Sequence, residues 1–276
     1  MMTRLHPAQR VGESALAGER YACTGEPSGS VLLLHAFGSC GADWVYQIPA
    51  LREHFDILTV DLPGHGRSPL PVGCARVEDM ARLVACHLGD LGVGRVHVVG
   101  LSLGGVVALA LTQEQPELIA SLVLVNAFAR LRISKRGRGL ILRRVIHLLR
   151  GDMRALADTI AGGIFPAPEQ RFLREAAAGR IAANPRDVYS VLLKALYRVD
   201  LRAGLREMRL PCLVVSGEAD TTVAESAKRE LSEKIPSARW MSIPGSGHAT
   251  PLDMPETFNR ILLDFLLHVP SAPHQG

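Results

Sequence analysis

A serine, an aspartate and a histidine stand in glycine-containing segments at three separate places in the sequence. Ser102 lies in Gly-Leu-Ser-Leu-Gly, Asp220 in Gly-Glu-Ala-Asp and His248 in Gly-Ser-Gly-His. A serine hydroxyl becomes a good nucleophile when a positioned imidazole takes its proton, and a carboxylate can hold the tautomer of that imidazole. These residue types in this order predict a catalytic triad that attacks a carbonyl group, with Ser102 as nucleophile, His248 as base and Asp220 as its orienting acid.

The segment around Ser102 has the composition of a sharp turn between a strand and a helix. The apolar run Val96 to Gly100 precedes it, and the helical stretch Leu103 to Gln115 follows it. Glycine two residues on either side is expected, because a strained turn leaves no room there for a Cβ. The helix N-terminus would then offer a backbone N–H to a developing oxyanion. The alternative is a plain crossover turn in which Ser102 only caps the helix.

His248 is selected from the ten histidines by its position. It stands in a glycine-rich loop between the last predicted strand and the final predicted helix, where it can reach the carboxyl ends of the strands. Asp220 follows the preceding strand and reaches the same edge of the sheet. Glu218 and Asp253 are weaker candidates for the acid, and a turn-forming or helix-capping role is the alternative for Asp220. Surface, terminal, strand or helix positions argue against His6, His54, His87, His97, His147, His268 and His274.

Short runs rich in valine and leucine alternate with amphipathic helical segments. This alternation predicts an α/β fold with a mostly parallel sheet whose strands are buried on both faces. The predicted strands are Val31 to His35, Ile57 to Asp61, Val96 to Gly100, Leu122 to Val125, Cys212 to Ser216 and Trp240 to Ile243. The predicted helices are Val77 to Leu91, Leu103 to Gln115, Val223 to Lys234 and Pro255 to Leu267. The segment Leu16 to Ala22 is expected to add an antiparallel strand pair at an edge.

The alternation stops in residues 128–208, where helical segments follow one another without a strand pattern. An all-helical insertion is therefore predicted within a core of residues 1–127 and 209–276. Asn184 is expected to be the N-cap of one of its helices, with Pro185 as the first helical residue.

The insertion begins with a basic stretch, Arg130 to Arg154. Its apolar residues on one helical face are Leu140, Ile141, Val145, Leu148 and Leu149. This face predicts either packing of the insertion on the core or contact with anionic lipid or an acidic carrier-bound substrate.

The composition is that of a folded globular protein, with 47% hydrophobic and 21% charged residues. A net charge of +4 spread over 276 residues gives no reason to expect a nucleic-acid partner. The five cysteines contain no C-x-x-C pair, so neither a disulfide framework nor a zinc site is predicted. The sequence has no signal-like apolar segment and no uninterrupted apolar run of membrane-spanning length, which favours a cytoplasmic protein without stable membrane insertion.

These segments together resemble the α/β-hydrolase superfamily over roughly residues 31–127 and 210–267. His35-Ala36-Phe37-Gly38 is similar to the family's His-Gly-x-Gly loop, and residues 61–68 are similar to its D-x-x-G-x-G-x-S loop. Gly217-x-x-Asp220 and Gly247-His248 look like its acid and base motifs. The resemblance implies an eight-stranded, mostly parallel sheet with helices on both faces, and an all-helical lid inserted after the sixth strand.

The resemblance also implies roles for individual residues. The backbone N–H groups of Phe37 and Leu103 would form the oxyanion hole, and His65 would be structural. Ala36 departs from the usual glycine, so a loop that needs a left-handed backbone there must bend differently in this chain. Serine at the turn argues against the dehalogenase and epoxide-hydrolase branches, which use aspartate.

An ester or related acyl compound is the expected substrate, cleaved through an acyl-enzyme without a metal or organic cofactor. Leu101 and Phe128 are expected to make the pocket apolar, and packing in the core is the alternative for Leu101.

The string Gly-Leu-Ser-Leu-Gly-Gly resembles esterases and enol-lactonases of the superfamily. A carbon–carbon bond hydrolase of aromatic degradation is a second hypothesis, although relatives usually have a polar residue in place of Leu101. A slow-turnover ligand receptor on the same scaffold is the third, and the oligomeric state stays open.

Overall fold

The computed structural model describes residues 2–5, 16–131 and 135–269. Its strands are β1 Met2–Leu5, β2 Gly18–Tyr21, β3 Ser30–Leu34, β4 Asp56–Val60, β5 Val96–Leu101, β6 Ile119–Val125, β7 Cys212–Gly217 and β8 Ala238–Ile243. They form one sheet in the order β1-β2-β4-β3-β5-β6-β7-β8. Strands β3 to β8 are parallel, whereas β1 and β2 extend the sheet by antiparallel pairing. The mostly parallel sheet is therefore confirmed. Of the antiparallel pair expected in Leu16 to Ala22, only β2 lies in that segment, and its partner β1 lies at Met2–Leu5.

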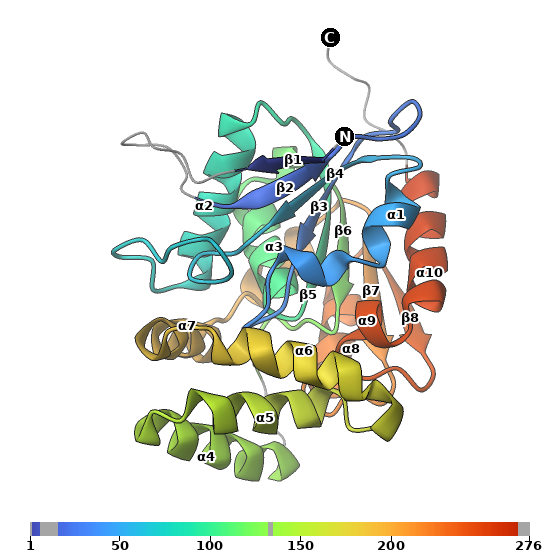
Figure 1. Ribbon diagram of the computed structural model, residues 1–276. Coiled ribbons are helices and arrows are strands. Elements are labelled where there is room, and N and C mark those ends of the chain that lie inside the picture. The colour runs from blue at the N-terminus through green and yellow to red at the C-terminus, as the bar shows by residue number, and fades with distance from the viewer. Residues whose placement is uncertain (1, 6–15, 132–134, 270–276) are drawn as a thin grey trace.

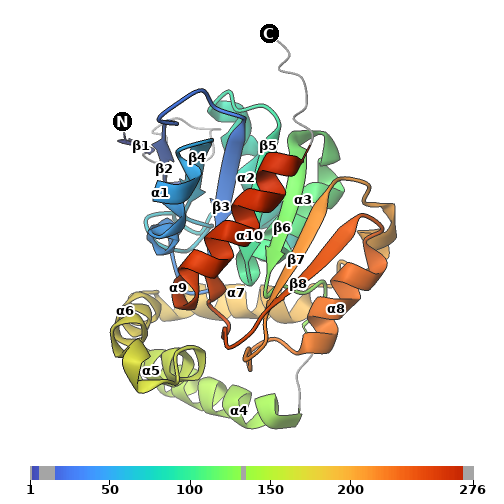
Figure 2. The ribbon, with the colours of Figure 1, turned by 90° about the vertical axis from the view of Figure 1, so that its right-hand side faces the viewer.

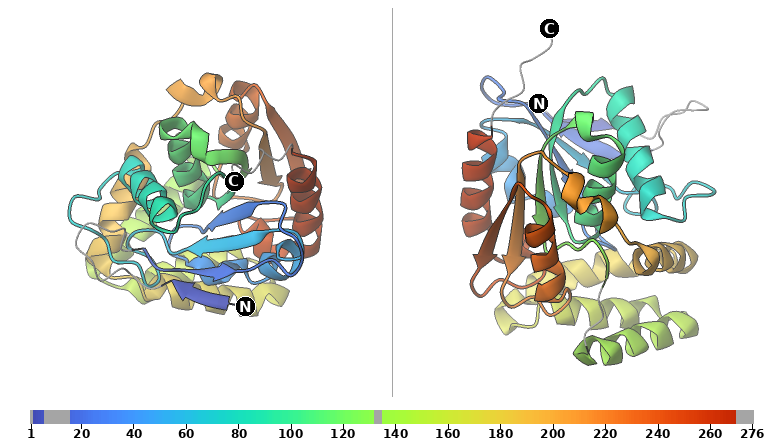
Figure 3. Two further views of the ribbon diagram at one scale, coloured as in Figure 1. Left: turned by 90° about the horizontal axis from the view of Figure 1, so that it is seen from above. Right: turned by 180° about the vertical axis from the view of Figure 1, so that it is seen from behind.

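Helices cover both faces of this sheet (Figures 2 and 3). One face carries α2 Val77–Asp90, α3 Leu103–Glu114 and α8 Glu225–Lys234, which share an apolar cluster with the sheet. The other face carries α1 Gln47–Leu51 and α10 Pro255–His268, and α9 Thr250–Asp253 immediately precedes α10. The two apolar clusters, one on each face, hold these helices against the sheet.

Burial on both faces holds for the central strands and fails at one edge. Every residue of β5 and β6 is buried, as their continuous apolar sequences predict. Strand β8 instead alternates between half-buried and exposed residues up to its last residue, the buried Ile243, so the prediction that the strand is buried on both faces is wrong. It is the last strand of the sheet, and its Trp240 ring packs under the Arg229 guanidinium, 4.6 Å from the ring centroid.

Between β6 and β7 the chain forms four α-helices that lie together across the end of the sheet at which the parallel strands finish (Figures 1 and 2). They are α4 Lys135–Arg150, α5 Met153–Ile164, α6 Arg171–Ala182 and α7 Arg186–Arg198. Three short 3₁₀ helices, η2 Pro116–Leu118, η3 Pro168–Gln170 and η4 Ala203–Glu207, and the loop helix η1 Gly41–Trp44 complete the described elements. The four helices have a small apolar cluster of their own, which includes Leu156, Ile160, Ile181 and Tyr189.

Two details of this helical segment differ from the sequence predictions. Helix α7 begins at Arg186 with Pro185 as its N-cap, so the prediction of Asn184 as N-cap is wrong. The Asn184 amide instead donates to the carbonyl oxygens of Arg180, at 2.8 Å, and Gly38, at 3.3 Å. This amide therefore closes the preceding helix and ties it to the loop after β3.

The apolar face of the basic helix α4 is divided between the interior and the surface. Leu148 packs against the small apolar cluster, whereas Val145 is 39% and Leu149 73% exposed. The side chains of Leu140 and Ile141 lie outside the described part of the structure. Packing thus accounts for only part of the predicted face. Among the described helices, none is both long and apolar enough to cross a lipid bilayer.

Candidate active site

Ser102 lies at the point where β5 turns into α3. Its backbone has φ 52° and ψ −113°, and Asn126 is the other described non-glycine residue with positive φ. Such a conformation is costly for a residue with a Cβ and persists only where the surroundings impose it. Ser102 occupies the N-cap position without a side-chain capping bond, so the predicted alternative of a simple capping serine has no support in the structure.

Three glycines leave the space in which this turn is built. A Cβ at Gly100 would overlap the backbone of Gly104, and a Cβ at Gly104 would overlap the carbonyl oxygen of Leu34. At Gly105 it would overlap the Ala127 side chain. The start of α3 is therefore pressed against β3 and β6, as the glycine spacing predicts.

The structure brings Asp220 and His248 together from two different loops. Asp220 follows β7 and His248 follows β8, and the imidazole Nδ1 lies 3.1 Å from both carboxylate oxygens. The two side chains are 0% and 6% exposed. The loops interlock, because a Cβ at Gly217 would overlap the carbonyl oxygen of Gly247. With Nδ1–H donated to the carboxylate, Nε2 carries the lone pair that a general base needs.

The Asp220 carboxylate is held ionised by its neighbours. Its Oδ1 accepts the backbone N–H groups of Thr222, at 2.8 Å, and Val223, at 3.2 Å. Burial acts to raise the pKa of Asp220, but His248, the Lys228 ammonium and the Thr222 N–H outweigh it and lower the pKa to about 2. The turn-forming role and the contact with histidine are therefore combined in one carboxylate.

The rival carboxylates occupy other positions. Glu218 is exposed. Asp253 lies on α9, where it accepts the Ser246 hydroxyl at 2.8 Å and the Gly247 N–H at 2.6 Å. Burial raises the pKa of Asp253. Its hydrogen bonds fix the loop that precedes His248, so it supports the histidine from the backbone side and Asp220 supports it from the ring side.

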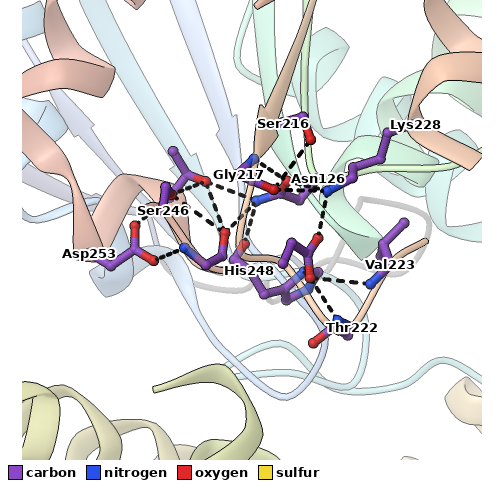
Figure 4. A network of polar contacts seen from close by, with 12 residues as sticks. Asn126, Ser216, Gly217, Thr222, Val223, Lys228, Ser246, His248 and Asp253 are labelled. Carbon is purple, nitrogen blue, oxygen red and sulfur yellow. Dashed lines mark hydrogen bonds and ion pairs between the residues drawn. The ribbon is translucent and has the colours of Figure 1, made fainter. Parts of the chain in front are cut away.

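Two residues that were not predicted from the sequence connect these loops (Figure 4). Asn126, the residue after β6, donates from its amide to the carbonyl oxygen of His248 at 2.8 Å and accepts the Gly217 N–H at 2.8 Å. The Lys228 ammonium on α8 lies 3.3 Å from the Asn126 Oδ1 and 3.2 Å from the Asp220 Oδ2. Asn126 stood at the end of a predicted strand, the same signal that marked Ser102 and Asp220. Lys228 carried no motif.

The backbone of the strand ends continues the sheet into these loops. The Ser102 N–H donates to Val125 O at 2.9 Å, and the Asn126 N–H donates to Val215 O at 2.9 Å. The four residues Ser102, Asn126, Asp220 and His248 thus follow four neighbouring strands, β5 to β8, where these parallel strands end. This carboxyl end of the strands is called the sheet edge. Within the described residues, the Ser102 hydroxyl has no hydrogen bond to His248. Such bonds between nucleophile and base are often long in unliganded enzymes and tighten when substrate binds.

The loop after β3 carries the residues predicted to bind an oxyanion. Ala36 has no positive φ, and the left-handed residue in this turn is Gly38, with φ 78°. The Ala36 side chain is therefore compatible with the loop. The Phe37 ring packs edge-on against Tyr189 of α7, with ring centroids 4.6 Å apart. Leu103 is the first residue of α3, where a helix leaves its amides without partners inside the helix.

The loop from Asp61 to Ser68 is built around the Asp61 carboxylate. It accepts the N–H groups of Gly41, at 2.8 Å, and Arg67, at 2.9 Å, and a Cβ at Gly66 would overlap it. The Ser68 hydroxyl donates to the Asp61 carbonyl at 2.6 Å. These contacts explain the glycine and serine spacing of the motif as a requirement of the loop backbone.

Two buried histidines support this loop in their neutral form. His35 Nε2 accepts the Leu62 N–H at 2.9 Å, and His65 Nδ1 donates to Pro63 O at 3.1 Å. Burial lowers the pKa of His35 to about 4 and the pKa of His65 to about 3. The structural placement predicted for His65 therefore has a physical basis in its hydrogen bond and its burial.

Leu101 and Phe128 lie in different apolar clusters on opposite faces of the sheet. They are 5% and 1% exposed, and core packing accounts for both, so a contact of either with substrate stays a prediction.

A pocket of about 390 Å³ opens instead between the 64–70 loop and the turn from α6 to α7. Its lining includes Leu70, Arg180 and Val188. No group of three or more potential metal-ligating side chains occurs among the described residues.

Comparison with known proteins shows which family the chain belongs to. The model of the alpha/beta hydrolase family matches residues 31–261. The chain belongs to this family. A relative from Caulobacter segnis that carries the name carbamate hydrolase RutD is 34% identical over 247 residues, which cover 86% of this chain and 90% of the relative.

Two solved structures have a similar fold. The enol-lactonase from Burkholderia xenovorans LB400 superimposes with a TM-score of 0.84 at 25% identity, covering 92% of this chain and 96% of that one. A thermophilic esterase from Thermogutta terrifontis has a TM-score of 0.80 at 25% identity, with 98% and 99% covered. The α/β-hydrolase family and fold expected from the motifs are therefore confirmed, and the chain is a hydrolase.

Proposed function

We propose that this hydrolase cleaves a carboxylic ester or a related acyl compound through a Ser102, His248 and Asp220 triad. The observation that carries the proposal is the buried contact of 3.1 Å between His248 Nδ1 and Asp220, at the sheet edge where Ser102 stands on a strained turn. This contact fixes the imidazole tautomer in which Nε2 is free to take a proton.

In the first half of the reaction, Ser102 Oγ attacks the substrate carbonyl carbon and passes its proton to His248 Nε2. The carbonyl π electrons move to oxygen, and the N–H groups of Phe37 and Leu103 donate to that oxyanion. Asp220 stabilises the imidazolium while it exists. Collapse of the intermediate breaks the bond to the leaving group, which takes the proton from His248 and leaves an acyl-Ser102 ester.

The second half repeats these steps with water as the nucleophile. His248 Nε2 removes a proton from water, the hydroxide attacks the acyl carbon, and the released Ser102 oxygen takes the proton back. Carboxylic acid and free enzyme result. Every proton transfer uses side chains of this chain, and the scheme needs no cofactor.

The class of substrate follows from the bond that this scheme breaks. The names of the relatives refer to carbamate, enol-lactone and ester compounds, all of which offer a carbonyl carbon with a heteroatom leaving group. We propose that residues 128–208 act as a lid over the sheet edge and select among such compounds. The packing of Tyr189 against Phe37 supports this role, because it joins α7 to the oxyanion loop.

The test is hydrolysis of p-nitrophenyl acetate together with labelling by a fluorophosphonate probe. Ser102→Ala should lower kcat by at least about a thousandfold and abolish labelling, because the nucleophile is lost. Ser28→Ala, an exposed serine in a distant loop, is the matched control and should behave as the parent does. Absence of turnover and of labelling in the parent, with Ser102→Ala indistinguishable from it, would favour a ligand receptor over a hydrolytic triad.

A further inference from the structure

A buried lysine lies beneath the Asp220–His248 pair. The Lys228 side chain is 1% exposed, and its Nζ lies 3.2 Å from Asp220 Oδ2. Removing an ammonium group from water is unfavourable unless partners replace the lost hydration, so lysine is rarely buried this completely. The site must therefore supply those partners.

Each N–H of the ammonium has an acceptor. Besides Asp220 Oδ2, these are the carbonyl oxygen of Gly217 at 3.2 Å and the side-chain oxygen of Asn126 at 3.3 Å (Figure 4). An ammonium has three donors and no acceptor, and three acceptors surround this one. The surroundings of Lys228 thus match its charged form.

Lys228 and His248 share one carboxylate. Asp220 Oδ2 lies 3.2 Å from the Lys228 Nζ and 3.1 Å from the His248 Nδ1. A cation that already pairs with a carboxylate reduces the electrostatic stabilisation that the carboxylate can give to a second cation. An imidazolium at His248 is therefore stabilised less than it would be by Asp220 alone.

Other charged groups around this cluster differ from Lys228 in placement. Asp253 on α9 acts electrostatically on both His248 and Asp220, and its oxygens bond to the loop at Ser246 and Gly247. Lys234 pairs with Glu230 at 2.6 Å near the surface. The remaining charged residues on η4, α8 and β8 and in the loop after β7 are exposed: Arg206, Glu207, Glu218, Glu225, Arg229, Glu233 and Arg239.

We propose that Lys228 is a positioning residue that sets the pH range of the reaction: its ammonium balances the charge of Asp220, so that His248 stays unprotonated and able to act as a base at lower pH. This inference rests on the proposed triad function. Asn126 contributes to this arrangement, because its side chain accepts from the Lys228 ammonium and donates to the backbone carbonyl of His248.

The test compares Lys228→Met, Lys228→Gln and the control Lys234→Met with the parent. For each, kcat/KM with p-nitrophenyl acetate and the rate of fluorophosphonate inactivation are measured across acid and neutral pH. Loss of the buried cation should move the midpoint of the acid limb upward by about one pH unit in both Lys228 variants. Lys234→Met should leave the midpoint in place, because that cation pairs near the surface.

Lys228→Gln retains an N–H donor without the charge, and it carries the test if Lys228→Met does not fold, as judged by circular dichroism. If a folded variant is too slow to assay, the pH midpoint of the His248 ring signals in nuclear magnetic resonance spectra should show the same rise.

An unchanged midpoint in a folded Lys228 variant, with rates lowered equally at every pH, would overturn the inference. So would unfolding of both variants while Lys234→Met stays intact, because the lysine would then be structural. Failure of the triad itself is distinguishable, because Ser102→Ala would then keep its activity and its labelling.

Discussion

The sheet edge and the helical segment above it are held in different ways. At the edge, the ends of β5 to β8 are joined by backbone hydrogen bonds and by the Asn126 amide, and glycines stand where no further carbon fits. Helices α4 to α7 meet this edge through side chains, such as Tyr189 on Phe37 and Asn184 on Gly38 O. Backbone contacts fix atoms more closely than side-chain contacts do. This difference agrees with the proposal that the reaction takes place at the strand ends and that helices α4 to α7 select the substrate.

The strongest test of this difference substitutes one glycine in each region. Gly104→Ala places a carbon against the Leu34 carbonyl oxygen and should lower the free energy of unfolding by at least about 3 kcal/mol. Gly179→Ala in α6 meets nothing within 4 Å and should be neutral or stabilise the helix by up to about 1 kcal/mol. Urea unfolding measures both. Equal effects would contradict the difference in packing.

A second comparison uses two asparagines. Asn126→Ala removes three donor contacts, to the carbonyl oxygens of Gly247 and His248 and to the Thr250 hydroxyl. It also leaves the Gly217 N–H and the Lys228 ammonium short of an acceptor, so it should cost roughly 3 kcal/mol and slow the proposed reaction. Asn184→Ala removes donor contacts that are only partly buried, at the end of α6, and should cost about 1 kcal/mol. Thermal unfolding and ester turnover give the two readouts, and a milder loss at Asn126 than at Asn184 would contradict this expectation.

Acidification should destabilise the sheet edge through its buried histidines. His35 and His65 have pKa values of about 4 and about 3 in the folded protein, against an ordinary value of 6.5. Their contribution to stability is therefore complete above pH 6.5 and is lost as pH falls toward these values, on the order of 1 kcal/mol per pH unit for each group. His65→Asn should reduce the slope of this pH dependence in urea unfolding by the share of one group, whereas His147→Asn on α4 should leave the slope unchanged. A parent whose stability is constant between neutral pH and pH 5 would contradict this prediction.

The smallest effect is expected on the outer surface of the helical segment. Leu149→Ala removes an apolar side chain that is 73% exposed and should change the free energy of unfolding by less than about 0.5 kcal/mol. Leu156→Ala, at a position with 0% exposure in the same segment, should cost about 3 kcal/mol. A large destabilisation by Leu149→Ala would mean that this face has a partner in solution.

The sequence predicted the structure best where the backbone conformation restricts which residue types can occupy a position. Glycines around Ser102, Asp220 and His248 report tight turns at strand ends, and these turns are local enough to read from the chain. The continuous apolar runs of β5 and β6 likewise report burial on both faces.

Prediction failed where the answer depends on distant partners. The edge position of β8 follows from strand order, which its own six residues do not encode. The contact of Lys228 with Asp220 depends on how α8 is rotated against the loop. Asn126 had the strand-end position as its signal, but no glycine motif around it pointed to a role. The placement of Leu101 and Phe128 depends on the two covering layers, so their predicted contact with substrate is still to be tested.

The most direct measurement is identification of the residue modified by a fluorophosphonate, by mass spectrometry of the digested protein, in the parent and in His248→Ala. A single adduct is expected on the peptide that contains Ser102, formed far more slowly without the imidazole. An adduct on another residue, or labelling of Ser102 at the same rate in His248→Ala, would contradict it.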